Sequence, residues 1–73
     1  MRKWLKDIRT ELGLSQAAFA ERLRISEAAY SLIERGLRQK KVDVEFVVTV
    51  AEAAEKDAMS LLETVIREEY STR

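Results

Sequence analysis

The sequence predicts an all-α protein of five helices, arranged as a single domain over residues 1–73. The chain has no proline and only two glycines, so few residues interrupt a helix. Hydrophobic residues make up 47% and charged residues 36%, a balance typical of a folded helical domain rather than a disordered chain. Apolar residues also recur at helical spacing, and glycines and serines separate the successive groups.

The first apolar group predicts a helix near the N-terminus. Its members are spaced so that they share one helical face: Trp4, Leu5, Ile8 and Leu12. Gly13 is expected to end this helix, because a glycine just past a helix readily takes the left-handed backbone conformation. Leu14 can then fold back on the last helical turn.

Two short helices follow, and a serine precedes each. Ser15 and Ser26 are suited to cap them, because a serine hydroxyl accepts a hydrogen bond from a backbone N–H that has no helical partner. A second glycine, Gly36, ends the third helix as Gly13 ends the first. The residues expected to point inward from the two helices are Phe19, Ala20, Leu23, Tyr30 and Ile33.

Residues 42–50 are compatible with two structures. Their alternation and β-branched residues favour a strand, but no other segment resembles a strand with which they could pair. A helix from about Val44 to Ala54 is therefore the prediction, and a two-stranded ribbon across a dimer is the alternative. The expected inner face of the helix comprises Phe46, Val47, Val50, Ala51 and Ala54.

The last helix is predicted from about Asp57 to Glu69. Its apolar stripe is broad, because Leu61 and Val65 widen the row formed by Met59, Leu62 and Ile66. A stripe this wide exceeds what one neighbouring helix covers, so we expect a homodimer interface that includes Leu61 and Val65. The alternative is that the whole stripe packs inward.

The charge is unevenly distributed, although the net charge is zero. Residues 1–41 hold ten Lys and Arg against five acidic residues, whereas residues 42–73 hold three against eight. The first part therefore carries a net charge of +5 and the second −5. This asymmetry favours an anionic partner for the first part, with two ordinary solvated faces as the alternative.

Composition makes several classes of protein improbable. The chain has no cysteine and no histidine, and it has no glycine-rich phosphate loop, so we expect no enzyme, metal site or cofactor. Its longest uncharged run has nine residues, far short of the ~20 that cross a membrane, and charges interrupt any signal peptide at the start. We expect a cytoplasmic protein with no membrane partner and no small-molecule substrate.

The most informative segment spans residues 15–36, which predict two helices of about eight residues joined by a short turn. In such a helix-turn-helix, the first helix lies across the DNA backbone and the second presents its first turn to base edges in the major groove. The arrangement therefore points to double-stranded DNA as the partner.

This segment resembles the lambdoid repressor and Cro, or Xre-like, helix-turn-helix family, over about residues 4–62. The resemblance rests on the following residues: Leu14, Ser15, Gln16, Ala20, Leu23, Ile25, Ser26, Ser31, Ile33, Glu34 and Gly36. It implies a compact five-helix lambda-repressor-like domain whose second and third helices form the motif, over about residues 15–35. It also implies a sequence-specific transcriptional regulator, of the small repressor, controller or antitoxin type, that binds operator DNA as a dimer. The alternative is a protein-interaction module on the same scaffold, with weak or no DNA binding.

The resemblance assigns roles to residues of the first three helices. Gln16 would contact a DNA phosphate, unless it is a simple surface residue. Arg9 and Glu34 would form a structural ion pair between the first and third helices, unless they are separate solvated charges.

The third helix would contact the bases through Ser26, Glu27, Ala28 and Leu32, with Ser31 beside them. These residues include no Arg, Lys, Asn or Gln that could make a bidentate base contact. Glu27 can accept from a cytosine amino group, and Ala28 or Leu32 can touch a thymine methyl. The alternative is an exposed helix face with another use.

The loop after the third helix would follow the phosphate backbone through Arg35, Arg38, Lys40 and Lys41, unless it is simply solvated.

The chain also departs from the family pattern. Arg24 replaces the usual turn glycine, at a cost on the order of 1 kcal/mol if the turn keeps its left-handed conformation. Tyr30 replaces a small aliphatic residue, so its hydroxyl needs a partner. Lys41 stands near the usual proline.

Overall fold

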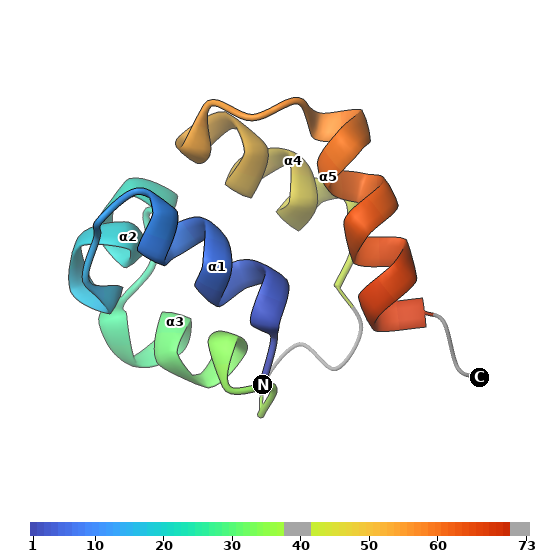
Figure 1. Cartoon of the computed structure of the whole chain (residues 1–73). Coiled ribbons are helices and arrows are strands. Elements are labelled where there is room, and N and C mark those ends of the chain that lie inside the picture. The colour runs from blue at the N-terminus through green and yellow to red at the C-terminus, as the bar shows by residue number, and fades with distance from the viewer. Residues whose placement is uncertain (38–41, 71–73) are drawn as a thin grey trace. The chain divides into compact units, whose positions relative to one another are not determined.

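The computed structural model describes residues 1–37 and 42–70, and in these ranges every regular element is helical. These ranges contain five α-helices, labelled in Figure 1. They are α1 (Lys3–Glu11), α2 (Gln16–Leu23), α3 (Glu27–Glu34), α4 (Val44–Ala54) and α5 (Ala58–Val65), and a π-helical turn, Ile66–Tyr70, follows α5. The predicted all-α class is confirmed. The segment that could have been a strand is α4, so the ribbon alternative is wrong.

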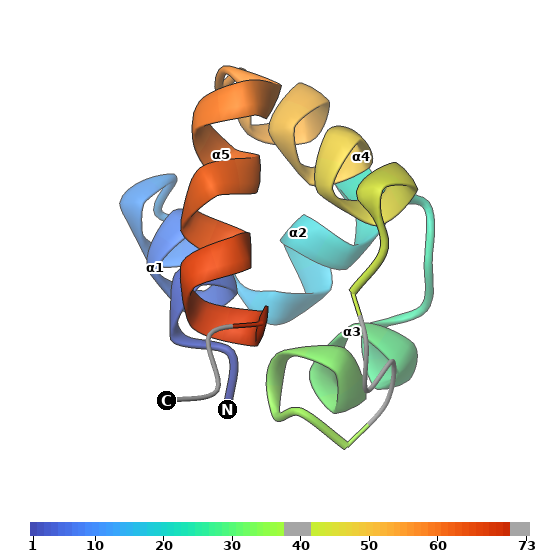
Figure 2. The same cartoon turned by 90° about the vertical axis from the view of Figure 1, so that its right-hand side faces the viewer.

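The chain folds as two compact units, Met1–Lys40 and Lys41–Arg73. In the first unit, α3 packs against both α1 and α2. In the second, α5 folds back against α4, as both Figure 1 and Figure 2 show. The buried apolar residues of α1, α2 and α3 are Trp4, Leu5, Ile8, Phe19, Ala20, Leu23, Tyr30 and Ile33. Those of the second unit are Val42, Val47, Val50, Ala51, Ala54, Leu61 and Val65.

Side-chain caps begin four of the five helices. The predicted caps are confirmed, because the Ser15 hydroxyl accepts from the N–H of Ala18 at 3.1 Å and the Ser26 hydroxyl from that of Ala29 at 3.0 Å. Asp43 and Asp57 cap α4 and α5 in the same way. Carboxylates at these positions also interact favourably with the positive end of the helix dipole.

Arg24 adopts the left-handed conformation at the end of α2, with φ 63° and ψ 40°. The turn therefore keeps the shape that a glycine would favour, and the arginine tolerates the strain. We expect Arg24→Gly to stabilise the protein by about 0.5–1 kcal/mol, because the released strain exceeds the added entropy of the unfolded chain. Urea unfolding measures the change, and Arg24→Ala is the control that removes the side chain but keeps a Cβ. Equal stability of the two variants would contradict a backbone origin.

The end of the chain departs from the predicted helix over 57–69. Regular α-helix stops at Val65, and the wider π-helical turn Ile66–Tyr70 continues it. The Tyr70 hydroxyl at the end of this turn donates to the backbone carbonyl of Val42, which ties the end of the second unit to its beginning.

The two dimer residues predicted on α5 are buried within the chain. Leu61 is 6% exposed and Val65 is fully buried, so both side chains belong to the core and neither is available to a second chain. The apolar residues that α5 and the following turn expose are Met59, Ile66 and Tyr70. Sequence spacing could not separate these two rows, because a wide apolar stripe does not show which of its edges faces the core.

Candidate nucleic-acid interface

The turn between α2 and α3 sets the geometry of the helix-turn-helix. The N–H of Ile25 donates to the carbonyl of Ala20 at 3.0 Å, a closing bond that the left-handed Arg24 makes possible. Ser26 then begins α3. Beneath the turn, the Phe19 and Tyr30 rings meet edge to face with centroids 5.5 Å apart, which fixes α2 against α3.

The outer face of α3 carries the residues that sequence analysis assigned to base contact. Ser26, Glu27 and Ala28 are exposed, and Ser31 and Leu32 are half-buried. The opposite face is buried in the core. The Ser26 oxygen caps the helix, but its hydroxyl proton remains able to donate to a ligand. The first turn of α3 is therefore open to a partner.

A carboxylate lies buried behind this outer face. Glu34 is only 2% exposed. Two nitrogens of the Arg9 guanidinium donate to its carboxylate, Nε to Oε1 at 2.9 Å and Nη2 to Oε2 at 3.1 Å. Arg9 Nη1 also donates to the carbonyl of Leu14 at 3.0 Å. The structure thus brings Arg9 and Glu34 together as a bidentate pair that joins α1 to α3.

Two further side chains donate to the same carboxylate, and sequence analysis did not identify them as its partners. The Tyr30 hydroxyl donates to Oε1 at 2.6 Å, and Gln16 Nε2 donates to Oε2 at 3.1 Å. Tyr30 lies one helical turn before Glu34, a spacing that could have indicated the contact. Gln16 is distant in sequence, and no pattern indicates its bond. We refer to Arg9, Gln16, Tyr30 and Glu34 as the buried polar cluster.

The cluster shifts the pKa values of its members. Burial acts to raise the pKa of Glu34, but the hydrogen bonds from Arg9, Tyr30 and Gln16 outweigh it and lower the pKa below its ordinary value. Burial and the bond to the carboxylate raise the pKa of the Tyr30 hydroxyl far above its ordinary range. The carboxylate is therefore charged and the phenol neutral near pH 7.

Arg2 is a second structural cation that sequence analysis did not single out. Its side chain is buried, and its Nη1 donates to the carbonyl of Ile33 at 2.6 Å. Its backbone N–H donates to the carbonyl of Glu34 at 2.7 Å. Both carbonyls belong to the last turn of α3, at the negative end of the helix dipole, where a cation is favoured.

The basic segment after α3 is described only in part. Arg35 is exposed, whereas Arg38, Lys40 and Lys41 lie outside the described residues.

Among the residues that the structure describes, no group of three acidic, His or Cys side chains could hold a metal ion. None of the helices in this part of the chain is long and apolar enough to cross a membrane.

Comparison with known proteins agrees with this geometry. A helix-turn-helix family model matches residues 5–58. An uncharacterized HTH-type transcriptional regulator of Bacillus subtilis (strain 168), YqaF, is 46% identical over 44 residues, which cover 60% of this chain. The match spans 58% of that relative's length. No solved structure matches the chain significantly.

Proposed function

This chain belongs to the helix-turn-helix family of the lambda-repressor type, and from that premise we propose that it is a transcriptional regulator that binds operator DNA sequence-specifically. The observation that carries the proposal is the exposed first turn of α3, held at a fixed angle to α2 by the turn and the buried polar cluster. This is the arrangement that places a helix in the major groove.

Contacts to the DNA backbone would come from α2 and from the basic segment. The N–H groups at the start of α2 point outward at the positive end of the helix dipole, where a phosphate binds well. Gln16 lies there, and its bond to Glu34 uses one of the two amide hydrogens, so the other can reach a phosphate oxygen. Arg35, Arg38, Lys40 and Lys41 would add affinity that does not depend on sequence.

Base contacts would come from a few side chains that each discriminate only modestly between bases. Glu27 accepts from the amino group of cytosine, Ala28 touches a thymine methyl, and the Ser26 and Ser31 hydroxyls fit either kind of base edge. The lack of a bidentate residue on this face is the specific observation that favours the second candidate, a protein-interaction module. The two functions differ in whether α3 contacts DNA.

Ser26→Asp tests that contact. Aspartate caps a helix as well as serine does, so the free energy of unfolding should stay within about 0.5 kcal/mol of its original value. The added negative charge at the entrance to the groove should weaken binding to a selected operator duplex about tenfold or more, because it faces phosphates and base edges. Fluorescence anisotropy at two salt concentrations measures the loss.

The matched control is Ser60→Asp, which adds the same charge at an exposed position of α5. It should leave the affinity within about twofold, because long-range repulsion is screened at moderate salt. If both variants bind like the original protein, α3 does not enter the groove. If the original protein does not bind duplex DNA at micromolar concentration and ~50 mM salt, the interaction-module function stands instead.

We also propose that the protein acts as a homodimer through the C-terminal helix. The corrected candidates are Met59, 69% exposed, and Ile66, 51% exposed, together with Tyr70. A two-fold dimer would present two copies of α3 to half-sites about 34 Å apart, which compensates for the modest specificity of each copy.

Ile66→Asp should convert the dimer to a monomer, because a carboxylate at the centre of an apolar interface has no partner for its charge. Light scattering gives the mass, and operator affinity should fall at least about tenfold as the second half-site contact is lost. Glu63→Gln, a change at an exposed polar position of α5, should leave the dimer intact. An unchanged mass for Ile66→Asp would contradict this interface.

A further inference from the structure

Most cations of α1 and its cap are already engaged by groups of the protein. Lys3 Nζ lies 2.7 Å from Asp7, the Arg9 guanidinium binds Glu34, and Arg2 donates to the carbonyl of Ile33. Lys6 is different, because it is exposed and no acidic side chain in the described residues pairs with it. Arg35, directly after α3, is also exposed, and no acidic side chain in the described residues pairs with it.

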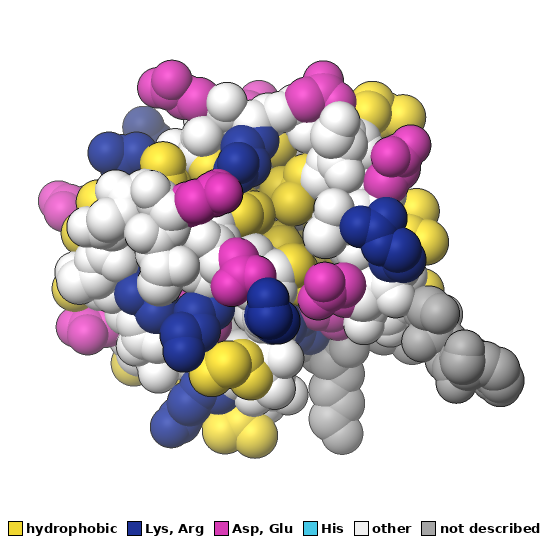
Figure 3. All heavy atoms as spheres, in the orientation of Figure 1, with side chains coloured by type: hydrophobic (Ala, Val, Ile, Leu, Met, Phe, Trp, Pro, Cys, Tyr) yellow, Lys and Arg dark blue, Asp and Glu magenta, His cyan; other side chains and the backbone are white. Residues whose placement is uncertain are grey.

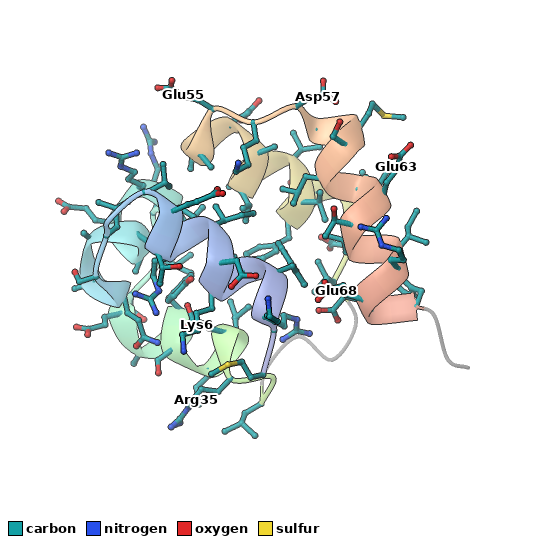
Figure 4. All side chains as sticks on the ribbon, in the orientation of Figure 1. Lys6, Arg35, Glu55, Asp57, Glu63 and Glu68 are labelled. Atoms are coloured by element: carbon teal, nitrogen blue, oxygen red, sulfur yellow. The ribbon has the colours of Figure 1, made fainter. Side chains whose placement is uncertain are left out.

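Lys6 lies on the side of α1 that faces the end of α3. Arg2, Lys6 and Arg9 are spaced by four and three residues, so they share one side of the helix. The outer two both bond to the last turn of α3, at Ile33 and Glu34, which places Lys6 beside that turn. Figure 4 shows Lys6 and Arg35 on the same side of the first unit, and Figure 3 shows dark blue side chains on this face.

Attraction to the negative end of the α3 dipole accounts for little of this arrangement. Such an attraction is small at an exposed position, and Arg2 already donates to the carbonyls of that end. An exposed ammonium without an acidic partner is available to neutralise a DNA phosphate, which releases counterions condensed on the DNA. A lysine also suits a single phosphate oxygen, because its charge is compact and its donors rotate freely.

We propose that Lys6 and Arg35 together form a phosphate-binding surface, which extends the DNA contacts of the first unit from α3 onto α1. The inference rests on the proposed DNA-binding function and adds a contact residue on a helix to which sequence analysis gave only a structural role. In the sequence, Arg35 is followed by the basic segment that holds Arg38, Lys40 and Lys41. The ligand is the sugar–phosphate backbone, so the contact is independent of base sequence.

The test compares Lys6→Gln with Lys3→Gln on a mixed-sequence duplex of 20 base pairs. The two variants lose the same charge from the same helix, but Lys3 is paired with Asp7 and Lys6 is unpaired. We expect Lys6→Gln to weaken binding about three- to tenfold at ~100 mM salt. It should also reduce the slope of log affinity against log salt by about 0.9, the value for one phosphate contact. Lys3→Gln should change affinity less than about twofold, and Lys6→Arg should restore both affinity and slope.

The outcomes separate this inference from the function on which it rests. If the original protein binds the duplex with strong salt dependence but the two glutamine variants have equal affinity and equal slope, the Lys6 contact is overturned and DNA binding stands. If the original protein does not bind at all, both are overturned. Thermal unfolding of each variant verifies that it is folded, and substitution at these exposed positions should leave the midpoint nearly unchanged.

Discussion

Glu34→Gln is expected to lower the free energy of unfolding by about 3 kcal/mol, because it removes the charge that balances Arg9 and leaves donors without a full acceptor. Glutamine has nearly the same shape as glutamate, so the loss would not reflect a cavity. In the original protein, the Glu34 carboxylate accepts hydrogen bonds from Arg9, Tyr30 and Gln16. The single amide oxygen of glutamine cannot accept from all of them. Urea unfolding measures the change, with the exposed Glu63→Gln as the control.

A double-mutant cycle with Arg9→Met isolates the ion pair. A coupling free energy of about 1.5 kcal/mol or more is expected, because the pair is bidentate and largely shielded from water. A coupling near zero would mean that the loss in Glu34→Gln comes from Tyr30, Gln16 or packing and not from Arg9.

The lowered pKa of Glu34 predicts that the free energy of unfolding depends on pH. The folded protein holds the pKa of Glu34 below its unfolded value, so the unfolded state binds the proton more readily. The stability that this carboxylate contributes is therefore fully present above about pH 4.5, and it is lost as the pH falls through the lower folded pKa. The stability difference between the original protein and Glu34→Gln should narrow below about pH 4. A difference that stays constant to pH 3 would contradict the assignment.

Reversing two charges of the basic segment, Arg38→Glu with Lys40→Glu, is expected to weaken binding to duplex DNA at least about a hundredfold at ~100 mM salt. The two proposed phosphate contacts would become repulsive, and the salt slope should fall by about 1.8, the value for two contacts. Anisotropy titrations between 50 and 200 mM salt measure both quantities. Urea unfolding of the double variant verifies that it is folded at the concentrations used for binding.

The control makes the same change in net charge elsewhere. Lys56→Glu with Arg67→Glu reverses two exposed cations of the second unit. If it weakens binding as strongly as the first pair, net charge alone explains the loss and the segment after α3 has no special place on the DNA backbone. If the first pair has no effect, the backbone contact is absent.

Local rules predicted most of the secondary structure. The two serine caps, the left-handed Gly13 and the bounds of α4 all follow from interactions within a few residues of each position. The end of α5 was predicted less well, because a change from α-helix to a π-helical turn leaves no mark in residue spacing.

The contacts within the candidate site were predictable only where the family resemblance linked residues that are distant in sequence. The pairing of Arg9 with Glu34 came from the family pattern, because two residues on different helices share no local signal. The bond from Gln16 to Glu34 and the burial of Arg2 are also long-range, and nothing in the sequence indicates them. Burial of Leu61 in place of Met59 likewise depends on packing, which residue spacing alone does not determine.

The division of α3 into a buried and an open side has an evolutionary consequence. Tyr30, Ile33 and Glu34 maintain the fold, whereas Glu27 and Ala28 face outward and contribute little to packing. If the protein binds operator DNA as proposed, arginine or glutamine introduced at the outward positions would change the preferred operator at small cost in stability. Binding preference and foldedness are thus separable traits of a single eight-residue helix, and a lineage can change the first while conserving the second.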